Sequence, residues 1–335
     1  MISRYIMWSG QTACFDSKGK QVDCKHLGLE CETHRISPWP EPRFERLSQD
    51  IVRDRATQLI WPRNALLTEY PLNWKESLEW IQEINSQHLF ERNDWRLPNR
   101  RELRSLIDHS KKKPALPDSH VFHNIALGWY WTSTTAAMNT RYAWYLHTEG
   151  GRMFYGNKSE YYWTLPVSGV SDMIPQTGQH ACFDSDGQES NCVETGQDGS
   201  LQQGVHWPEP RFTSHEHGIL DQLTGLIWYP EGDLTGSAVT WDEAIQAVKT
   251  HSKTTGQPFR LPTINEIESL IDASQHSPAL PAHHMFASLH DGYWTSTTSG
   301  YEPDWSYVLY LNKGAVGVGY KPNRDFHVWP VMNLQ

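Results

Sequence analysis

The chain of 335 residues carries one sequence pattern twice, in the same order. Residues 10–24 read GQTACFDSKGKQVDC, and residues 178–192 read GQHACFDSDGQESNC. Later motifs return in pairs: Trp39–Phe44 with Trp207–Phe212, Trp95–Pro98 with Phe259–Pro262, and Tyr130–Thr135 with Tyr293–Thr298. Self-similarity that keeps its order over the whole length indicates a tandem duplication. We therefore expect two copies of one domain, at 1–170 and 171–335, joined by the polar segment 167–172.

Each copy is predicted to be α+β, with two helices followed by short antiparallel strands. Apolar residues recur at helical spacing over 74–84, and the counterpart at 241–249 opens with a capping box, Thr240 and Glu243. A second helix is expected after each Leu-Pro pair, capped by Asn99 in one copy and by Thr263 in the other. Aromatic and β-branched residues then predict strands, including 129–134 and 292–297.

The composition argues against two classes of interaction. The net charge is −10 and the longest basic run is Lys111–Lys113, so the clustered Lys and Arg that bind nucleic acids are lacking. No apolar stretch reaches the ~18–20 residues of a transmembrane segment. Residues 1–8 lack the apolar segment and cleavage site of a standard signal peptide. Removal of a leader upstream and another export route both stay open.

Aromatic residues are unusually frequent, with 16 Trp, 14 Tyr and 10 Phe. This number exceeds the usual need of a hydrophobic core, so some rings are expected at a surface used for recognition. The alternative is that this fold uses Trp as an ordinary core residue. For any single Trp the sequence favours neither interpretation.

The duplication indicates how four of the five cysteines pair. Cys14 with Cys24, and Cys182 with Cys192, would each close a short loop containing Asp-Ser-x-Gly, which is typical of turns. Such a disulfide stabilises a fold by roughly 2.5–3 kcal/mol in the chain-entropy model. Reduced thiols of a cytosolic protein are the alternative, and the cysteine spacing resembles no zinc site. Cys31 has no counterpart in the second copy and is expected to be a free thiol or an intermolecular link.

The combined motifs resemble the C-terminal domain family of a Legionella collagen-like adhesin (Lcl_C, formerly DUF1566). They are Cys-Phe-Asp-Ser-x-Gly, Trp-Pro-x-Pro-Arg-Phe, Thr-Gly-Leu-Ile-Trp, Arg-Leu-Pro-x-x-x-Glu-Ile-x-Ser-Leu and Tyr-Trp-Thr-Ser-Thr. The resemblance covers nearly all of both copies and is closer in the second, because Gln58 replaces the glycine of Thr-Gly-Leu in the first. It implies two tandem C-type-lectin-like domains, a fold that hosts sugar binding, protein binding and oxidation alike.

An enzymatic function is not expected. The segment Arg-Leu-Pro-Thr-x-x-Glu is similar to one in formylglycine-generating sulfatase-modifying enzymes, which oxidise through cysteines late in their domain. This chain has no Cys after Cys192 and none between 32 and 181. The 17 His residues include His283–His284 and the pair His215 and His217, but neither pair recurs in the other copy. Scattered surface His is therefore the favoured interpretation, and no zincin, nucleophile-elbow or phosphate-loop motif occurs.

The clearest candidate binding site is the segment 301–305, between two expected strands of the second copy. C-type lectins carry Glu-Pro-Asn or Gln-Pro-Asp in a comparable loop, so the resemblance makes Glu302 and Asp304 candidate Ca²⁺ ligands. A chance turn is the alternative, and aromatic rings can stack on a sugar without any metal. No cofactor is required. The candidate ligand-binding residues are Trp294, Glu302, Asp304, Trp305 and Tyr307 in the second copy, and Arg141 and Trp144 in the first.

We therefore expect a non-enzymatic, adhesin-like protein outside the cytosol, at the cell surface, in the extracellular space or in the periplasm. Its partner would be a glycan or a surface protein. The alternative is a structural subunit of an extracellular filament or appendage that assembles with copies of itself. A concave aromatic site with convergent polar groups would favour ligand binding, whereas two complementary patches on one molecule would favour head-to-tail assembly.

Overall fold

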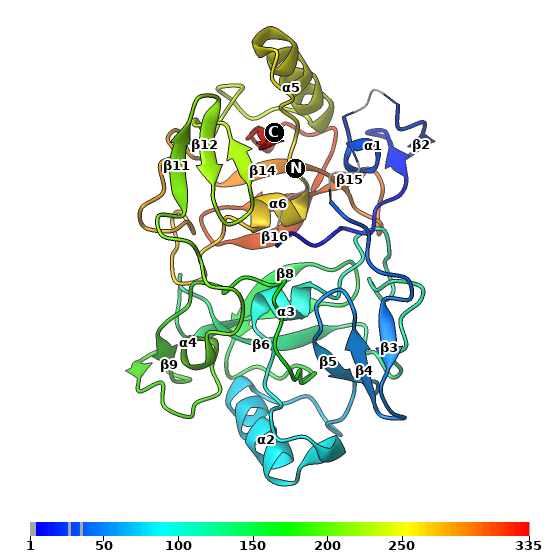
Figure 1. The fold of residues 1–335 in the computed structure, drawn as a ribbon, viewed down its shortest axis with the longest axis vertical. Coiled ribbons are helices and arrows are strands. Elements are labelled where there is room, and N and C mark those ends of the chain that lie inside the picture. The colour runs from blue at the N-terminus through cyan, green and yellow to red at the C-terminus, as the bar shows by residue number, and fades with distance from the viewer. Residues whose placement is uncertain (1–4, 26–27, 34–35, 335) are drawn as a thin grey trace.

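The structure is a computed structural model that describes residues 5–25, 28–33 and 36–334. Apart from the N-terminal hairpins, each of which lies in the half of the other repeat, its two halves correspond to the two repeats and face each other across the middle of the molecule (Figure 1). The long helices α2 (Trp74–Ser86) and α5 (Trp241–Thr255) lie at opposite ends, whereas the short helices α3 (Arg100–Arg104) and α6 (Ile264–Glu268) lie near the centre (Figure 1). The duplication of the sequence is therefore visible as a repeated arrangement of elements.

One six-stranded antiparallel sheet runs through both halves. Its strands are, in order, β14 (Gly292–Thr298), β15 (Trp305–Tyr310), β16 (Ala315–Tyr320), β8 (Met153–Asn157), β7 (Tyr142–His147) and β6 (Trp129–Thr135). Three strands come from each repeat, and the two sets meet where Val316 pairs with Met153. Both of these side chains are fully buried in an apolar cluster that contains residues of both repeats. The repeats therefore share one hydrophobic core.

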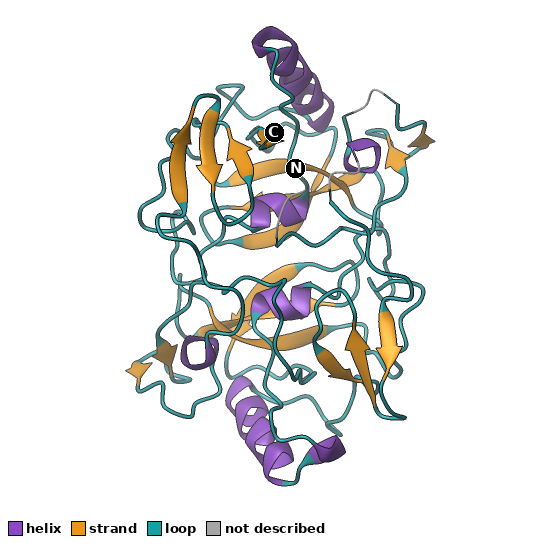
Figure 2. Ribbon diagram, in the orientation of Figure 1, coloured by secondary structure: helices purple, strands orange, loops and turns teal. Residues whose placement is uncertain are grey.

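Smaller sheets and hairpins lie around the central sheet (Figure 2). The first repeat has a three-stranded sheet of β3 (Phe44–Arg46), β4 (Ile51–Asp54) and β5 (Ile60–Pro62). The second has a four-stranded sheet of β11 (Phe212–His215), β12 (Gly218–Asp221), β13 (Leu226–Trp228) and β17 (Val331–Asn333). Each repeat begins with a two-stranded hairpin and a four-residue helix. These are β1 (Cys14–Phe15), β2 (Gln21–Val22) and α1 (Glu30–Thr33), and β9 (Cys182–Phe183), β10 (Glu189–Ser190) and α4 (Asp198–Leu201).

The two long helices form where the sequence predicts them and extend a little further. Asn73 and Glu76 form a capping box at the start of α2, and Thr240 and Glu243 form one at the start of α5. Helix α5 ends at Gly256, whose φ of 69° is the left-handed conformation that glycine adopts without strain. The buried residues are Trp74, Ser77, Leu78, Ile81 and Ile84 in α2, and Trp241, Ala244, Ile245 and Val248 in α5.

The expected fold class, α+β with two helices in each C-type-lectin-like copy, is wrong. In the described part of the chain, strand content is 26% and helix content 15%, and the helices number six, besides one 3₁₀ turn at Leu89–Glu91. The predicted second helices exist as α3 and α6, but each has only five residues. Most of the additional structure consists of strands of two to four residues, which are too short to show the alternation by which strands are recognised in a sequence.

The abundant tryptophans serve mainly the core. Eight of them are less than 2% exposed, and Arg and Tyr side chains pack beside them. These tryptophans are Trp61, Trp74, Trp131, Trp144, Trp228, Trp241, Trp294 and Trp329. The interpretation of Trp as an ordinary core residue therefore holds for these eight positions. The remaining rings include those that line a surface hollow described below.

The cysteines lie at disulfide distance, with one difference from expectation. The predicted pair Cys182–Cys192 is confirmed, with its sulfurs 2.03 Å apart. The sulfur of Cys14 lies 2.32 Å from that of Cys24 and 2.04 Å from that of Cys31. Because one sulfur forms a single disulfide, Cys24 and Cys31 are alternative partners of Cys14. The expectation that Cys31 lacks a partner in its own copy is wrong, since it is buried beside Cys14.

Candidate functional site

The N-terminal hairpin of each repeat packs against the other repeat. Gln11, just before β1, accepts a hydrogen bond at 3.0 Å from the backbone N–H of Thr298 in β14. In the same way, Gln179 accepts one at 2.7 Å from the backbone N–H of Thr135 in β6. Both glutamines also donate to the backbone carbonyl of the same threonine. The Thr-Ser-Thr-Thr motif at the end of each central strand is therefore a docking site for a hairpin.

Two equivalent lysines hold these hairpins in place. Lys158 donates to the carbonyls of Phe183 and Asp184 at 3.0 and 3.1 Å. Lys321 donates to the carbonyl of Asp16 at 3.1 Å, and its ammonium nitrogen lies 4.1 Å from the ring centre of Trp241. Both lysines are at most 1% exposed, and this burial lowers the pKa of each to about 7. Each lysine thus joins the two repeats through backbone carbonyls.

A buried carboxylate completes each docking site. The hydroxyl of Thr297 donates to Glu30 at 2.8 Å, and the hydroxyl of Thr134 donates to Asp198 at 2.6 Å. Burial raises the pKa of Glu30 to about 7 and that of Asp198 to about 6. The neighbouring carboxylate of Glu266 adds to the shift of Glu30. Both carboxyls are therefore stabilised in their neutral form in the folded protein.

This shift predicts a pH-dependent effect of Glu30→Gln. A carboxyl whose pKa is raised by folding contributes stability that is present below its unfolded value, near pH 4.5, and lost as pH rises through about 7. Glutamine stays neutral at both pH values. The free energy of unfolding of the variant should therefore be about 2–3 kcal/mol higher than that of wild type at pH 8 and within about 1 kcal/mol of it at pH 5. Urea unfolding at both pH values measures the difference. Equal differences at pH 5 and pH 8 would contradict the assignment.

Three of the four aromatic candidates lie inside the molecule. Trp144, Trp294 and Tyr307 are at most 1% exposed, so their rings are not available to a ligand from solvent. Trp305 is half-buried against Tyr320, with ring centres 5.4 Å apart.

The loops that carry the remaining candidates contact the exchanged hairpins. Gly19 of the first repeat's hairpin lies against the loop 301–305 of the second repeat, since a Cβ atom on Gly19 would be 2.9 Å from the backbone nitrogen of Asp304. Glu302 of the same loop is exposed. In the first repeat, Arg141 donates to the carbonyl of Asp186 at 3.1 Å. The candidate residue Arg141 thus contacts the hairpin of the second repeat through its Nε.

Potential metal ligands gather at two places within the described residues. One is the cysteine group Cys14, Cys24 and Cys31, and the other is Asp233, His290 and His327. Neither includes Glu302 or Asp304, the candidate Ca²⁺ ligands. The pattern of His residues gave no sign of the second group, because its members lie far apart in the sequence and meet only through folding.

An aromatic hollow lies where the N-terminal segment crosses the loop before β3. It has a volume of about 600 Å³, within the usual range of small-molecule sites. Its lining residues are Tyr5, Ile6, Met7, Trp8, Ser37, Pro38, Trp39, Pro40, Arg55, Ala56 and Met173. Tyr5 has a φ of 56°, which is unusual for a residue with a side chain and is typical of functional loops.

Two tryptophan rings line this hollow, and two arginines lie beside them. Trp8 and Trp39 meet edge to face with ring centres 5.0 Å apart, and the buried guanidinium of Arg43 lies 4.3 Å from the centre of the Trp39 ring. Among the described residues, none accepts a hydrogen bond from the indole N–H of Trp39. Arg55 is exposed at the rim, where it donates to the carbonyl of Pro42 at 3.1 Å. The hollow thus combines apolar ring surface with the exposed guanidinium of Arg55, whereas the Trp39 N–H and the Arg43 guanidinium are buried behind the rings.

The second repeat differs at this place. The residue that corresponds to Trp8 is Gln176, whose backbone carbonyl accepts a hydrogen bond at 2.9 Å from the indole N–H of Trp207. Trp207 corresponds to Trp39, so the N–H that has no acceptor in the first repeat has one in the second. The aromatic hollow is therefore a special feature of the first repeat.

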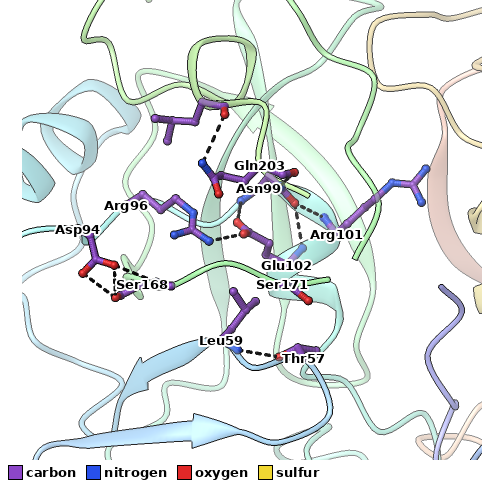
Figure 3. A network of polar contacts seen from close by, with 12 residues as sticks. Thr57, Leu59, Asp94, Arg96, Asn99, Arg101, Glu102, Ser168, Ser171 and Gln203 are labelled. Carbon is purple, nitrogen blue, oxygen red and sulfur yellow. Dashed lines mark hydrogen bonds and ion pairs between the residues drawn. The ribbon is translucent and has the colours of Figure 1, made fainter. Parts of the chain in front are cut away.

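A second hollow of about 410 Å³ lies near the start of α3. Arg96 pairs with Glu102 at 2.5 Å, and Asn99 caps the helix and donates to the carbonyl of Gln203 at 3.3 Å (Figure 3). Asp94 accepts a hydrogen bond from Ser168 at 2.8 Å in the same network (Figure 3). Most of these polar groups pair within the first repeat, and the bond from Asn99 to Gln203 joins them to the second, so the network serves mainly to fix the fold.

The fold and the site define a duplicated, strand-rich domain pair with a concave aromatic site. The family model of the Lcl C-terminal domain matches residues 50–168 and again residues 217–332. The chain belongs to the Lcl C-terminal domain family, and it contains two tandem copies of that domain. No curated protein matches the chain. Within the described ranges, no helix has both the length and the apolar character needed to cross a membrane.

The hollow was missed in the sequence because its parts are distant from one another. Trp8 and Trp39 belong to different motifs, and only Trp39 recurs in the second repeat. The signal that could have found the hollow is the loss of repetition itself, since Trp8 stands where the other copy has Gln176. A position at which a duplicated chain departs from its own pattern is a natural place for a new function.

Proposed function

We propose that this protein is a non-enzymatic, adhesin-like binding protein outside the cytosol, and that it holds a carbohydrate in the aromatic hollow of its first repeat. The observation that carries the proposal is a concave site with two tryptophan rings beside an exposed guanidinium. Sugar rings present C–H groups on their faces and hydroxyls at their edges, so they need apolar ring surface and hydrogen-bond donors side by side. Membership of the Lcl C-terminal domain family supports a surface-associated role.

The location follows from chemistry that the chain carries. Cys182 and Cys192 lie at bonding distance, and Cys14 lies at bonding distance from two other cysteines. Disulfides persist in oxidising compartments such as the periplasm and the extracellular space. These cysteines and the family together support export.

Trp8→Gln tests the proposal with a residue that the second repeat already contains at the equivalent position. The variant is therefore expected to fold. On a glycan array, and then by titration with the best glycan, we expect wild type to bind and Trp8→Gln to bind about tenfold more weakly, because one stacking contact is lost. The matched control is Tyr70→Ala, since Tyr70 is 67% exposed and lies outside the hollow.

Two outcomes would replace this proposal. If Glu302→Ala/Asp304→Ala abolishes glycan binding while Trp8→Gln matches wild type, the ligand binds at the loop of the second repeat. If no glycan binds and electron microscopy of purified protein shows ordered fibres, the protein is a filament subunit instead.

A further inference from the structure

Three side chains of the second repeat converge on a single oxygen atom. The Oδ2 atom of Asp233 lies 2.9 Å from Nδ1 of His327 and 3.4 Å from Nε2 of His290. The two imidazole rings are stacked, with centres 3.7 Å apart and planes within 1° of parallel. One potential ligand atom from each residue lies within 4.8 Å of the other two. Two imidazoles and one carboxylate form a ligand set that transition-metal ions prefer.

The carboxylate is held in a fixed orientation. The Oδ1 atom of Asp233 accepts hydrogen bonds from the backbone N–H and from the hydroxyl of Thr235, both at 3.0 Å. These two bonds occupy one oxygen and direct the other toward the imidazoles. Hydrogen bonds of this kind orient the ligands of known metal sites and raise their affinity.

The two histidines are fixed through their backbones. The N–H of His327 donates to the carbonyl of Gly292 at 2.9 Å, at the start of β14. The N–H of His290 donates to the hydroxyl of Tyr293 at 2.7 Å, and the Tyr293 side chain is fully buried. The backbones of both histidines are therefore anchored to residues of β14 in the central sheet.

The ligand atoms lie close enough together for one small ion that enters from solvent. Because the lone pair of an imidazole nitrogen lies in the ring plane and the two rings are stacked in parallel, the exposed His290 ring has to turn out of the stack to share an ion with His327. In a tetrahedral site with metal–ligand distances of about 2.0–2.1 Å, neighbouring ligand atoms are about 3.3 Å apart. The two measured separations, 2.9 and 3.4 Å, are close to that value. The side chain of Asp233 is 4% exposed, that of His327 17% and that of His290 41%. The site is thus closed behind the carboxylate and open beside His290.

The first repeat supplies an internal comparison. Asp233 corresponds in the alignment of the two copies to Leu66, His290 to Leu127 and His327 to Trp163. The bridge that Tyr293 forms with His327 is formed in the first repeat by Tyr130 with Trp163, so this equivalence is also structural. The fold is stable with apolar residues at all three positions. The architecture alone does not require the polar triad, and all three positions differ together.

We propose that Asp233, His290 and His327 bind a divalent transition-metal ion, with zinc as the best match to two imidazoles and one carboxylate. Three protein ligands leave a fourth position, on the side of His290, for water or for an oxygen or nitrogen atom of a bound molecule. Ca²⁺ and Mg²⁺ are disfavoured, because they prefer oxygen ligands in larger number. This site is independent of the carbohydrate hollow.

Zinc titration of the oxidised, full-length protein at pH 7.5, by calorimetry and by competition with a chromogenic chelator, tests the proposal. We expect wild type to bind one zinc ion per chain with a dissociation constant in the micromolar range or below. We expect His290→Leu and Asp233→Leu, which install the residues of the first repeat, to weaken binding by about 100-fold or more. Working without reductant leaves only one thiol among Cys14, Cys24 and Cys31, so these sulfurs cannot compete as a multi-thiolate zinc site.

Each control has a defined meaning. His283→Leu removes an exposed His of the same loop and should bind zinc as wild type does. The melting temperature without metal confirms that the variants fold, and zinc should raise it in wild type and in His283→Leu only. The proposal is overturned if wild type binds no zinc at 100 times the protein concentration. It is equally overturned if His290→Leu binds as tightly as wild type, or if His283→Leu loses as much affinity as His290→Leu.

Discussion

Glu268→Gln is expected to lower the free energy of unfolding by about 3–5 kcal/mol, because it leaves buried cations without their counter-charge. The Glu268 carboxylate lies 2.6 Å from Nε of Arg104 and 3.3 Å from Nη2 of Arg100. None of these three side chains is more than 11% exposed. The two arginines belong to α3 and the glutamate to α6, so the variant weakens the contact between the two repeats.

Chemical denaturation followed by tryptophan fluorescence measures this effect. The matched control is Glu79→Gln, which breaks the exposed Lys75–Glu79 pair, with its side chains 58–69% exposed, and should cost no more than about 0.5 kcal/mol. The double variant Arg104→Leu/Glu268→Leu should be less destabilised than the sum of its single variants, since neither partner remains unpaired. A loss below about 1 kcal/mol for Glu268→Gln would show that the charges are not coupled.

This ion pair also explains why the two copies pair within one chain. Arg104 and Glu268 occupy equivalent positions in the two repeats. In a pair of identical first repeats, arginine would face arginine near the centre, and in a pair of second repeats glutamate would face glutamate. Like charges at short distance in a buried site are strongly unfavourable. Divergence after duplication therefore favours the contact between unlike repeats.

Lys321→Met is expected to release the N-terminal hairpin from the second repeat. The Lys321 amine donates to the carbonyls of Asp16 and Pro303 at 3.1 and 2.8 Å and to the hydroxyl of Thr298 at 3.0 Å. A neutral amine still donates hydrogen bonds, so the contact persists above the pKa of about 7. Methionine keeps the length of the side chain but leaves these acceptors unsatisfied, at a cost of about 2–4 kcal/mol.

Hydrogen exchange followed by mass spectrometry locates this loss. Peptides from residues 11–24 should exchange about 100-fold faster in Lys321→Met, while peptides from α2 keep their wild-type rates. Lys313→Met, at an exposed position of the turn before β16, is the matched control and should change neither. Lys158→Met should have the corresponding effect on residues 178–202. Unchanged exchange in the hairpins of both variants would refute the role assigned to the lysines.

Helices and strands that are long enough to carry a repeated residue pattern were predictable from the sequence. Helices were expected at 74–84 and 241–249 because apolar residues recur at helical spacing, in the second case behind the capping box of Thr240 and Glu243, and the structure extends them to residues 86 and 255. The strands at 129–135 and 292–298 were expected because aromatic and β-branched residues cluster there. The fold class was wrong because strands of two to four residues carry too little pattern to be seen.

Two aromatic residues that were predicted to contact a ligand are buried instead. Trp294 and Tyr307 looked suited to a ligand because aromatic rings bind sugars, but composition cannot show which face of a strand is buried. Both rings are fully buried in the core. The exposed rings that line the hollow belong to segments with no regular periodicity, so no pattern marked them.

The sequence by itself determined the duplication, the family, the cap of the helix that begins at Trp241 and the pairing of Cys182 with Cys192, because each is carried by short motifs of adjacent residues. Only the tertiary structure decided that the repeats share a sheet, that their hairpins are exchanged, and that Asp233, His290 and His327 meet at one oxygen. The first two features depend on whether a segment packs against its own repeat or the other, and the third depends on residues that lie far apart in the chain. The recurring motifs are similar in both repeats, so contacts between distant residues decide these features.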